Sequence, residues 1–430
     1  MAMASPSLWL YRLLVAILLP VAIPVLNIRD WFRGKRRPSF RDRMSRKLPA
    51  IPAGGLWLHA VSVGEVELAR RLVRELAERA PDLPLLITAT TATGLELARR
   101  ALGANHSVIV CPLDLPGPVS RVLEAARPRA LVVVETEIWP EMLHQASRRG
   151  VATAVVNGRL SDASYRGYRR VRRLLAPFLR SLDLVAARAQ ADADRFAALG
   201  APVDRVRVVG NIKYDLEPDE TPLPWADSLR CAAGARPIIV AGSTMEGEEE
   251  AVLAAVARCA AGGRPVLLVL APRHPERFDA VAELVATRGL RLTRRSASQS
   301  PDPGTEVFLI DTIGELARAY QLATVAFIGG SLVPTGGHNP LEPAVWGVPV
   351  LSGPHVHNFV EVYDEMTTAG GARLVADGAA LSTALVEWLD APDAARASGA
   401  AGREVVEANR GATAVTAKAL LGLVAGASSS

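Results

Sequence analysis

The chain has few of the residues that build disulfide frameworks or metal centres. Its 430 residues include only three cysteines, Cys111, Cys231 and Cys259, which are far apart and odd in number. This usage is typical of reduced packing residues in a cytosolic environment, because disulfide frameworks use paired cysteines. The seven histidines form no HExxH or similar cluster. We therefore expect no catalytic metal and no cofactor.

A signature of nucleic-acid binding is also missing. The formal net charge is +5 at pH 7, and a basic balance makes nucleic acid a partner to consider. No binding module and no interleaving of aromatic with basic residues accompanies this charge. We therefore expect no nucleic-acid partner.

Long apolar sequence is concentrated at the amino terminus. Residues 8–28 are nearly continuously apolar, broken by Arg12, Pro20 and Pro24. About 20 apolar residues are needed to span a bilayer, so a kinked span and a helix lying in the interface both remain open. The basic cluster that follows favours a cytoplasmic location for the rest of the chain and attracts anionic lipid. We predict a membrane anchor and basic juxtamembrane segment over residues 1–48; the cluster comprises Arg29, Arg33, Lys35, Arg36, Arg37, Arg41, Arg43, Arg46 and Lys47.

Past residue 50, short apolar runs alternate with amphipathic stretches. This alternation is typical of α/β folds with parallel sheets and crossover helices, and the length requires two cores. Prolines and acids interrupt it at residues 215–225. We predict two doubly wound domains, 49–215 and 236–430 with a C-terminal helix, joined by a linker at 216–235. The expected strands are 56–61, 85–89, 107–111, 130–135, 152–157, 182–187 and 206–210, then 237–241, 266–271, 307–311, 325–329 and 348–352.

A lone carboxylate, Glu65, stands where the first strand is expected to turn into a helix. Ligands of open α/β sheets bind at this edge, where nucleotide folds usually place glycines and a phosphate. A carboxylate would repel phosphate, but the helix dipole would hold it ionised, as a general base requires. Ser62 and Glu65 also have the spacing of a capping box. The residues alone leave both roles open.

Charged residues follow several other expected strands. Glu135 ends the fourth strand, where a carboxylate beside apolar residues often signals function. Lys213 lies in the loop before the domain boundary, either as a surface lysine or as a cation that stabilises developing negative charge. In the second half, the turn at 241–248 is suited to phosphate contact through backbone N–H groups. Arg273 and His274 follow the next strand, and arginine binds phosphate in a bidentate manner.

A glycine-rich loop precedes a short helix near residue 340. Gly336 and Gly337 permit close approach of a ligand to the backbone. Asn339 is expected to cap the helix, with Pro340 at its first position. Glu342 then lies one turn in, where its carboxylate can accept from a ribose diol. We interpret the loop as a ligand cradle.

The helix expected after residue 165 has a basic face. One interpretation is an ordinary solvated face, since charged faces are the norm on surface helices. The alternative is a basic, partly apolar surface that meets membrane phosphates. The residues leave both open; the arginines are Arg166, Arg169, Arg170, Arg172 and Arg173.

Nine motifs together resemble the 3-deoxy-D-manno-octulosonic acid (Kdo) transferases, the lipid A glycosyltransferases of Gram-negative bacteria. The resemblance covers nearly all of the chain from residue 55 on, in family order. The motifs are HAVSVGE at 59–65, TATTATG at 88–94, ETEIWP at 135–140, NGRLSDASY at 157–165, GNIKYD at 210–215, AGSTMEGEE at 241–249, PRHPERF at 272–278, DTIGEL at 311–316 and GGHNPLEP at 336–343.

The resemblance implies a GT-B architecture, with two Rossmann-like domains facing a central cleft. It implies an acceptor-binding first domain, a second domain that binds CMP-Kdo, a lipid A precursor as acceptor, and a location at the cytoplasmic face of the inner membrane. Glu65 matches the catalytic base, and Glu135 and Lys213 match positions that support the transition state. The matching CMP-binding residues are Arg273, His274, Ile313, Gly314, Glu315, Asn339, Pro340, Leu341 and Glu342.

One residue departs from the family pattern, and two other functions are alternatives to this interpretation. Ile313 stands where many members of the family carry Met, which matters little if the contact is made by the backbone. A nucleotide-sugar epimerase shares the two-domain plan, but it has no need of an anchor. A membrane-tethered, two-lobed binding protein would face outward, contrary to the basic flank. The motifs do not indicate how many Kdo residues are transferred, or the oligomeric state.

Overall fold

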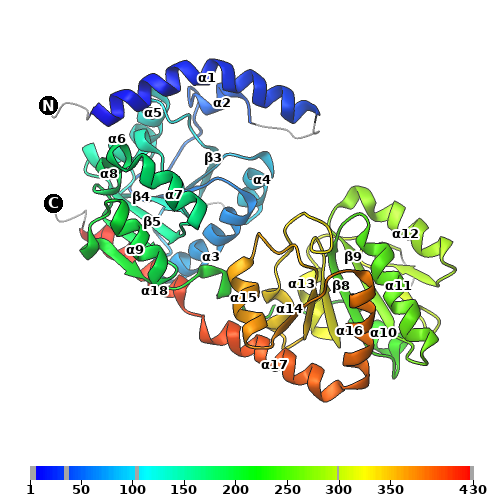
Figure 1. Ribbon diagram of the computed structural model, residues 1–430. Coiled ribbons are helices and arrows are strands. Elements are labelled where there is room, and N and C mark those ends of the chain that lie inside the picture. The colour runs from blue at the N-terminus through cyan, green and yellow to red at the C-terminus, as the bar shows by residue number, and fades with distance from the viewer. Residues whose placement is uncertain (1–5, 33–37, 102–105, 298–299, 427–430) are drawn as a thin grey trace. The chain divides into compact units, whose positions relative to one another are not determined.

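The computed structural model describes residues 6–32, 38–101, 106–297 and 300–426. These form two compact units, one of Met1–Asp215 with Arg410–Ser430 and the other of Leu216–Asn409 (Figure 1). Each unit holds a seven-stranded parallel sheet. The expectation of two α/β domains is therefore confirmed.

The first sheet has the strand order β3-β2-β1-β4-β5-β6-β7. All strands are parallel, and the order in which the chain adds them reverses between β1 and β4. Helices cover both faces, and separate apolar cores lie on the two sides. The strands are β1 (Leu56–Ala60), β2 (Leu85–Ala89), β3 (Ser107–Val110), β4 (Ala130–Val134), β5 (Ala152–Gly158), β6 (Leu184–Ala187) and β7 (Val206–Val208). One face carries α3 (Val63–Arg79), α4 (Ala92–Ala101) and α18 (Ala412–Gly426), and the other carries α5 (Pro116–Ala126), α6 (Pro140–Arg148), α8 (Arg172–Leu179) and α9 (Gln190–Leu199).

The second sheet has the order β10-β11-β9-β8-β12-β13-β14 and reverses between β8 and β12. Its strands are β8 (Ile238–Thr244), β9 (Leu267–Pro272), β10 (Leu292–Arg294), β11 (Val307–Leu309), β12 (Val325–Ile328), β13 (Val350–Ser352) and β14 (Ala372–Leu374). The helices of eight or more residues in this unit are α10 (Ala226–Ala233), α11 (Glu248–Ala261), α12 (Phe278–Thr287), α15 (Val360–Thr368), α16 (Gly378–Asp390) and α17 (Pro392–Ala408).

All twelve expected strands overlap observed ones, but β10 and β14 were not expected. Each is only three residues long and lies at an edge of the sheet. Each also contains an arginine, Arg294 or Arg373. Neither therefore presents the apolar run that marks a buried strand.

The expected extent of the second domain was wrong at both ends. Residues 216–235 are part of the second unit and include α10, whereas residues 410–430 belong to the first. Ala417, Leu420 and Val424 of α18 are buried in the first core. The Asp215 carboxylate accepts hydrogen bonds from the backbone N–H groups of Gly411 and Thr413. Burial of this apolar face holds the C-terminal helix on the first sheet.

Helix α1 (Pro6–Phe32) packs on α6 and α8, and its inward face includes the fully buried Leu8 together with Tyr11 and Arg12. Tyr11 donates a 2.6 Å hydrogen bond to Asp114, and Arg12 donates two 2.8 Å hydrogen bonds to Glu141, which has no exposed surface. Six large apolar side chains of the helix are exposed instead: Trp9, Leu10, Leu13, Leu14, Ile17 and Leu18.

No helix within the described ranges is long and apolar enough to cross a membrane. The predicted anchor is therefore not confirmed as a span. Four members of the predicted basic cluster, Arg33, Lys35, Arg36 and Arg37, lie outside the described residues.

Candidate active site

The reversal point of the first sheet brings two acidic residues close together. Glu65 is in the first turn of α3, directly after β1, and Glu135 directly follows β4, which pairs with β1. Ligands of doubly wound sheets bind at this point, outside the carboxyl ends of the strands. The fold therefore places two sequence-predicted catalytic residues at the expected ligand position.

Glu65 is held by a network that resembles a capping box. Its carboxylate accepts a 2.6 Å hydrogen bond from the backbone N–H of Val61 and a 3.0 Å hydrogen bond from the Ser62 hydroxyl. The Ser62 hydroxyl in turn accepts a hydrogen bond from the Glu65 N–H. In a capping box the carboxylate accepts from the backbone N–H of the N-cap residue, here Ser62, whereas in this protein it accepts from the backbone N–H of the residue before, Val61. The capping interpretation is thus largely confirmed, and it does not exclude a catalytic role.

Burial raises the pKa of Glu65 to about 7, and the charges of Glu135 and Glu137 act in the same direction. Hydrogen bonds from Val61 and Ser62 oppose this rise without cancelling it. The expectation that the helix dipole holds Glu65 ionised is therefore met only in part at neutral pH, because the residue is only 7% exposed and its carboxylate loses most of its hydration. A carboxylate with a pKa near 7 is nevertheless suited to general-base catalysis at neutral pH.

The raised pKa predicts how the stability of the protein depends on pH. A rise from 4.5 to about 7 on folding favours the protonated form in the folded state by roughly 3 kcal/mol. This contribution is fully present below about pH 4.5 and is lost as the pH rises through 7. We expect Glu65→Gln, which cannot ionise, to gain stability relative to the unsubstituted protein between pH 5 and 8, by up to roughly 3 kcal/mol. Chemical unfolding of both proteins across this range measures the difference, and parallel pH profiles would contradict it.

Glu135 has a backbone conformation that is rare for a residue with a side chain. Its φ is +60°, in the left-handed region. Its N–H donates to the carbonyl of Val156, which extends the pairing of β4 with β5 by one residue. Strained conformations of this kind cluster at functional sites. The turn holds Glu135 close enough for its charge to raise the pKa of Glu65.

Lys213 lies on the same side of the sheet, with its Nζ 3.9 Å from Oε1 of Glu135. The backbone of its loop is fixed by two residues that the sequence analysis did not single out. Asn157, buried at the end of β5 with a φ of +52°, accepts a hydrogen bond from the Ile212 N–H. Arg71 donates to the carbonyl oxygens of Ile212 and Lys213. Asn157 could have been predicted as a functional residue because it begins the NGRLSDASY motif. Nothing in the sequence indicates that Arg71 contacts this loop.

In the second unit, a buried glutamate fills the reversal point of the sheet. Glu248, the first residue of α11, has no exposed surface. Its carboxylate accepts hydrogen bonds of 2.6–2.9 Å from the backbone N–H groups of Met245, Gly330, Ser331 and Leu332. The expectation that the 241–248 turn leaves its N–H groups available to a phosphate is therefore wrong for Met245. Glu248 instead ties the loop after β8 to the glycine-rich loop after β12.

Arg273 and His274 follow β9, as expected, and both lie close to His338 of the glycine-rich loop. Burial, together with smaller electrostatic contributions from Arg273 and His274, lowers the pKa of His338 to about 4. His338 is therefore a neutral imidazole, and its buried Nε2 has no hydrogen-bond partner among the described residues. A Cβ at Gly330 would lie 2.9 Å from this ring, so the glycine is needed for the loop to close on His338. His338 was within a quoted motif but was not predicted as a site residue.

The remaining predicted donor residues lie in two loops of the second unit. Ile313 is 76% exposed and Gly314 has a φ of +93°, whereas the Glu315 carboxylate is bonded to Arg295, Thr312 and Trp225. Asn339 accepts from the Leu341 N–H and donates to Glu342, but the N-cap residue is Pro340, so the expected assignment of cap and first helical position is one residue early. The assigned helix α14 (Leu341–Ala344) begins one residue after Pro340. Among the described residues, no group of three or more His, Cys, Asp or Glu is arranged to hold a metal ion.

Comparison with known proteins identifies the family of this chain. Residues 34–216 match the family model described as 3-deoxy-D-manno-octulosonic-acid transferase (kdotransferase). The 3-deoxy-D-manno-octulosonic acid transferase of Haemophilus influenzae is 36% identical over 411 residues, which cover 94% of this chain and 96% of the relative. The chain belongs to the Kdo transferase family. The protein of that name from Bordetella pertussis is also 36% identical, over 92% of this chain and 96% of its own length.

Membership of the Kdo transferases makes the protein a glycosyltransferase and confirms the resemblance found in the motifs. The fold agrees with this assignment. The UDP-GlcNAc 2-epimerase of Neisseria meningitidis, solved with UDP-GlcNAc, aligns with 85% of this chain and 99% of its own at a TM-score of 0.56. At 14% identity this likeness shows the two-sheet fold alone. The two Rossmann-like units are consistent with the expected GT-B architecture.

Proposed function

We propose that the protein transfers Kdo from CMP-Kdo to a hydroxyl group of a lipid A precursor, in lipopolysaccharide core biosynthesis. The hydroxyl gives its proton to the Glu65 carboxylate as its oxygen forms a bond to the anomeric carbon of Kdo. The bond from that carbon to the phosphate oxygen of CMP breaks, and CMP leaves with the electron pair. Attack opposite the leaving group inverts the configuration at the anomeric carbon.

The observation that carries this proposal is the environment of Glu65. The side chain lies at the reversal point of the first sheet, is almost fully buried and has a pKa raised to about 7 by that burial. A base with this pKa is about half ionised at pH 7 and still binds a proton strongly. The Val61 and Ser62 hydrogen bonds hold one resting position, from which the carboxylate would turn toward an acceptor.

We further propose that the second unit binds the CMP-Kdo donor. Arg273 and His274 supply cationic and hydrogen-bonding groups for the phosphate, and Glu342 accepts from the ribose hydroxyls. Because the Glu315 carboxylate is already bonded to Arg295, the 313–315 segment would contact CMP through its backbone.

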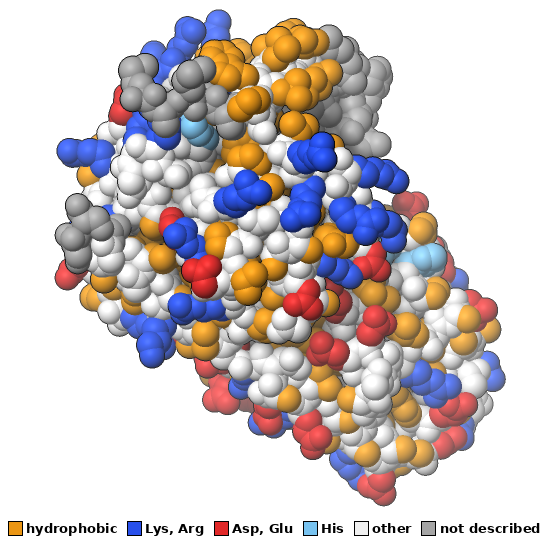
Figure 2. Space-filling view, turned by 60° about the vertical axis from the view of Figure 1, so that its left-hand side comes forward, with side chains coloured by type: hydrophobic (Ala, Val, Ile, Leu, Met, Phe, Trp, Pro, Cys, Tyr) orange, Lys and Arg blue, Asp and Glu red, His pale blue; other side chains and the backbone are white. Residues whose placement is uncertain are grey.

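We propose that α1 lies in the interface of the inner membrane, with the catalytic units on the cytoplasmic side. Its exposed apolar side chains have the spacing of one helix face, and Trp9 and Ile17 are 61% and 60% exposed. Figure 2 shows hydrophobic side chains gathered at the top of the view, near a group of Lys and Arg side chains. Helix α8, which packs beside α1, carries the exposed Arg172 and Arg173. Apolar area next to basic charge supports binding to anionic lipid.

Acceptor-dependent release of CMP tests the proposed reaction. We expect the purified protein to release CMP from CMP-Kdo when a lipid A precursor is present, and little without it. Incubation with UDP-GlcNAc in place of CMP-Kdo is the control for an epimerase of the same fold. Interconversion of UDP-sugars together with no CMP release would contradict the proposal.

Lys213 provides a test of transition-state stabilisation. Its ammonium lies close to Glu135, where it would oppose the negative charge that develops during transfer. We expect Lys213→Ala to lower kcat by roughly 10²-fold, as loss of one electrostatic stabiliser typically does, while CMP affinity changes little. Steady-state kinetics and CMP titration separate the two effects. An unchanged kcat would assign Lys213 to the loop structure alone.

A further inference from the structure

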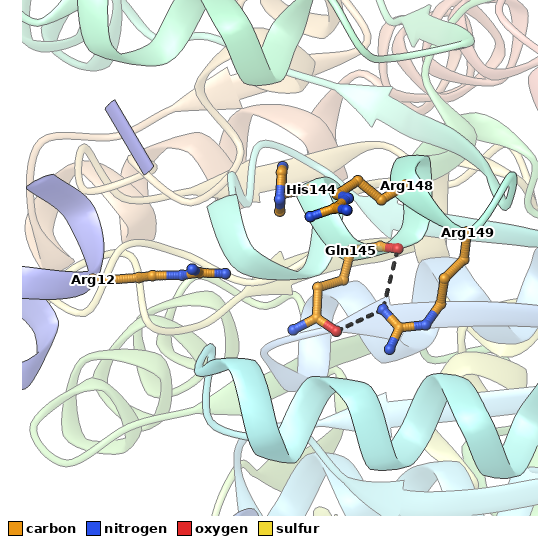
Figure 3. A pocket seen from close by; sticks show the side chains of 5 residues that line it. All are labelled: Arg12, His144, Gln145, Arg148 and Arg149. Atoms are coloured by element: carbon orange, nitrogen blue, oxygen red, sulfur yellow. Dashed lines mark hydrogen bonds between the residues drawn. The ribbon is translucent and has the colours of Figure 1, made fainter. Parts of the chain in front are cut away.

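A cationic pocket lies between α1 and α6, away from the proposed catalytic residues. It has a volume of about 320 Å³ and is lined by Arg12, His144, Gln145, Arg148 and Arg149 (Figure 3). Arg12 reaches into it from α1, and the other four side chains come from the last turns of α6 and the residue after it. Three arginines in one pocket are unusual, because like charges repel one another unless an anion or an acid compensates them.

The three arginines differ in how far their charge is compensated. Arg12 binds Glu141 through Nε and Nη2. Arg149 donates to the side-chain oxygen of Gln145 at 2.7 Å and lies 3.5 Å from Glu124. The side chain of Arg148 is exposed and makes no hydrogen bond or ion pair with any described residue. Its guanidinium is therefore the uncompensated charge of the pocket.

The pocket is separate from the proposed transfer site. Helix α6 starts at Pro140, shortly after Glu135, whereas the pocket-lining residues of this segment run from His144 to Arg149. At 1.5 Å per residue, Arg148 lies roughly 12 Å along the helix from Pro140. The cations therefore serve neither Glu65 nor the acceptor hydroxyl directly. Their position beside α1 instead connects them with the exposed apolar face of that helix.

We propose that this pocket binds the phosphate group of a bilayer lipid, with Arg148 as its main ligand. A guanidinium presents several N–H donors in a plane and binds phosphate oxygens in pairs. Arg12 keeps Nη1 free of the Glu141 contact, so it can donate to the same phosphate. Its neighbours Trp9 and Leu13 are exposed apolar residues of the same helix. A lipid would contact both the cations of the pocket and the exposed apolar side chains of α1, whereas a soluble phosphate would contact only the cations.

The inference rests on the proposed position of α1 at the membrane, and a sedimentation experiment with the full-length protein tests it. Two kinds of vesicle are compared, phosphatidylcholine alone and phosphatidylcholine with phosphatidic acid. We expect Arg148→Glu to weaken binding to the phosphatidic-acid vesicles about tenfold, the effect of losing one charge-assisted contact. The matched control is Arg99→Glu, which makes the same charge change at an exposed arginine of α4, on the opposite face of the sheet. It should change binding by less than about twofold, because it removes long-range attraction only.

An equal loss of vesicle binding for Arg148→Glu and Arg99→Glu would overturn the proposal. It would show that binding depends on the overall charge of the protein and not on a specific phosphate site. Titration with inorganic phosphate distinguishes the source of the ligand. Tight binding of phosphate that depends on Arg148, with vesicle binding unchanged, would assign the pocket to a soluble anion and contradict the lipid. Kdo transfer in detergent solution should be the same for Arg148→Glu and the unsubstituted protein. If the protein did not transfer Kdo, only this transfer assay would fail. If the pocket did not bind a lipid phosphate, only the vesicle sedimentation would fail, so the two results are distinguishable.

Discussion

Replacement of Glu65 by glutamine is expected to reduce Kdo transfer by roughly 10²- to 10⁴-fold, the usual cost of losing a general base. Glutamine keeps the shape of the side chain and can still accept a hydrogen bond from the Val61 N–H, so the start of α3 should remain intact. We therefore expect normal folding and normal CMP binding. Single-turnover kinetics with a lipid A precursor measures the loss at the transfer step.

Glu67→Gln is the matched control for this substitution. Glu67 lies two residues further along α3, is partly exposed and pairs with Arg70. An exposed pair of this kind contributes little to stability, so the variant should transfer Kdo at the normal rate. If Glu65→Gln retained normal turnover, or if both variants lost activity equally, Glu65 would be a helix cap without a catalytic role.

The pH dependence of the reaction should report the same residue. Because burial raises the pKa of Glu65 to about 7, the reactive carboxylate forms as the pH rises through 7. The value of kcat/KM should therefore increase with pH through this region and level off above it, since this parameter follows ionisation in the free enzyme.

The largest loss of stability is expected for Glu248→Ala. The substitution leaves four backbone N–H groups, those of Met245 and residues 330–332, without their acceptor in a buried site. Each unsatisfied buried donor costs about 1–3 kcal/mol, although water entering the site reduces the sum. We expect a loss of about 3–5 kcal/mol, comparable with breaking a buried charged contact. Chemical unfolding followed by a probe in the second unit measures it.

Glu250→Ala is the control for this prediction, because Glu250 is exposed in the same first turn of α11. It should change stability by less than about 0.5 kcal/mol. Amide hydrogen exchange gives a local readout: the N–H groups of Gly330, Ser331 and Leu332 should lose protection in Glu248→Ala only. Unchanged protection would mean that the loop is held by other contacts, such as the hydrogen bond from Ser331 to the Ile328 carbonyl.

The sequence predicted the sheets well because their central strands are short apolar runs between turn residues. The strand ends were predictable for the same reason, so Glu65 and Glu135 were correctly placed at one edge of the first sheet. The C-terminal helix was assigned to the wrong unit, since burial of Leu420 against α3 depends on contacts between distant parts of the chain. No local pattern records such a contact.

The pKa of Glu65 and the structural role of Glu248 could not be predicted from the local sequence, for a different reason. A helix N-terminus favours a charged carboxylate, but the pKa of Glu65 is decided by how completely tertiary packing removes water. Glu248 was hidden in a turn whose composition is also typical of phosphate binding. Its function became visible only when the structure brought Gly330 to its carboxylate.

The mass of the lipid formed when the protein acts on CMP-Kdo and a lipid A precursor tests the proposed transfer most directly. We expect a lipid heavier by one or more Kdo residues with the unsubstituted protein, and unchanged lipid over the same time with Glu65→Gln. Unchanged lipid with both proteins would contradict the proposed transfer, and equal product from both would contradict the role of Glu65.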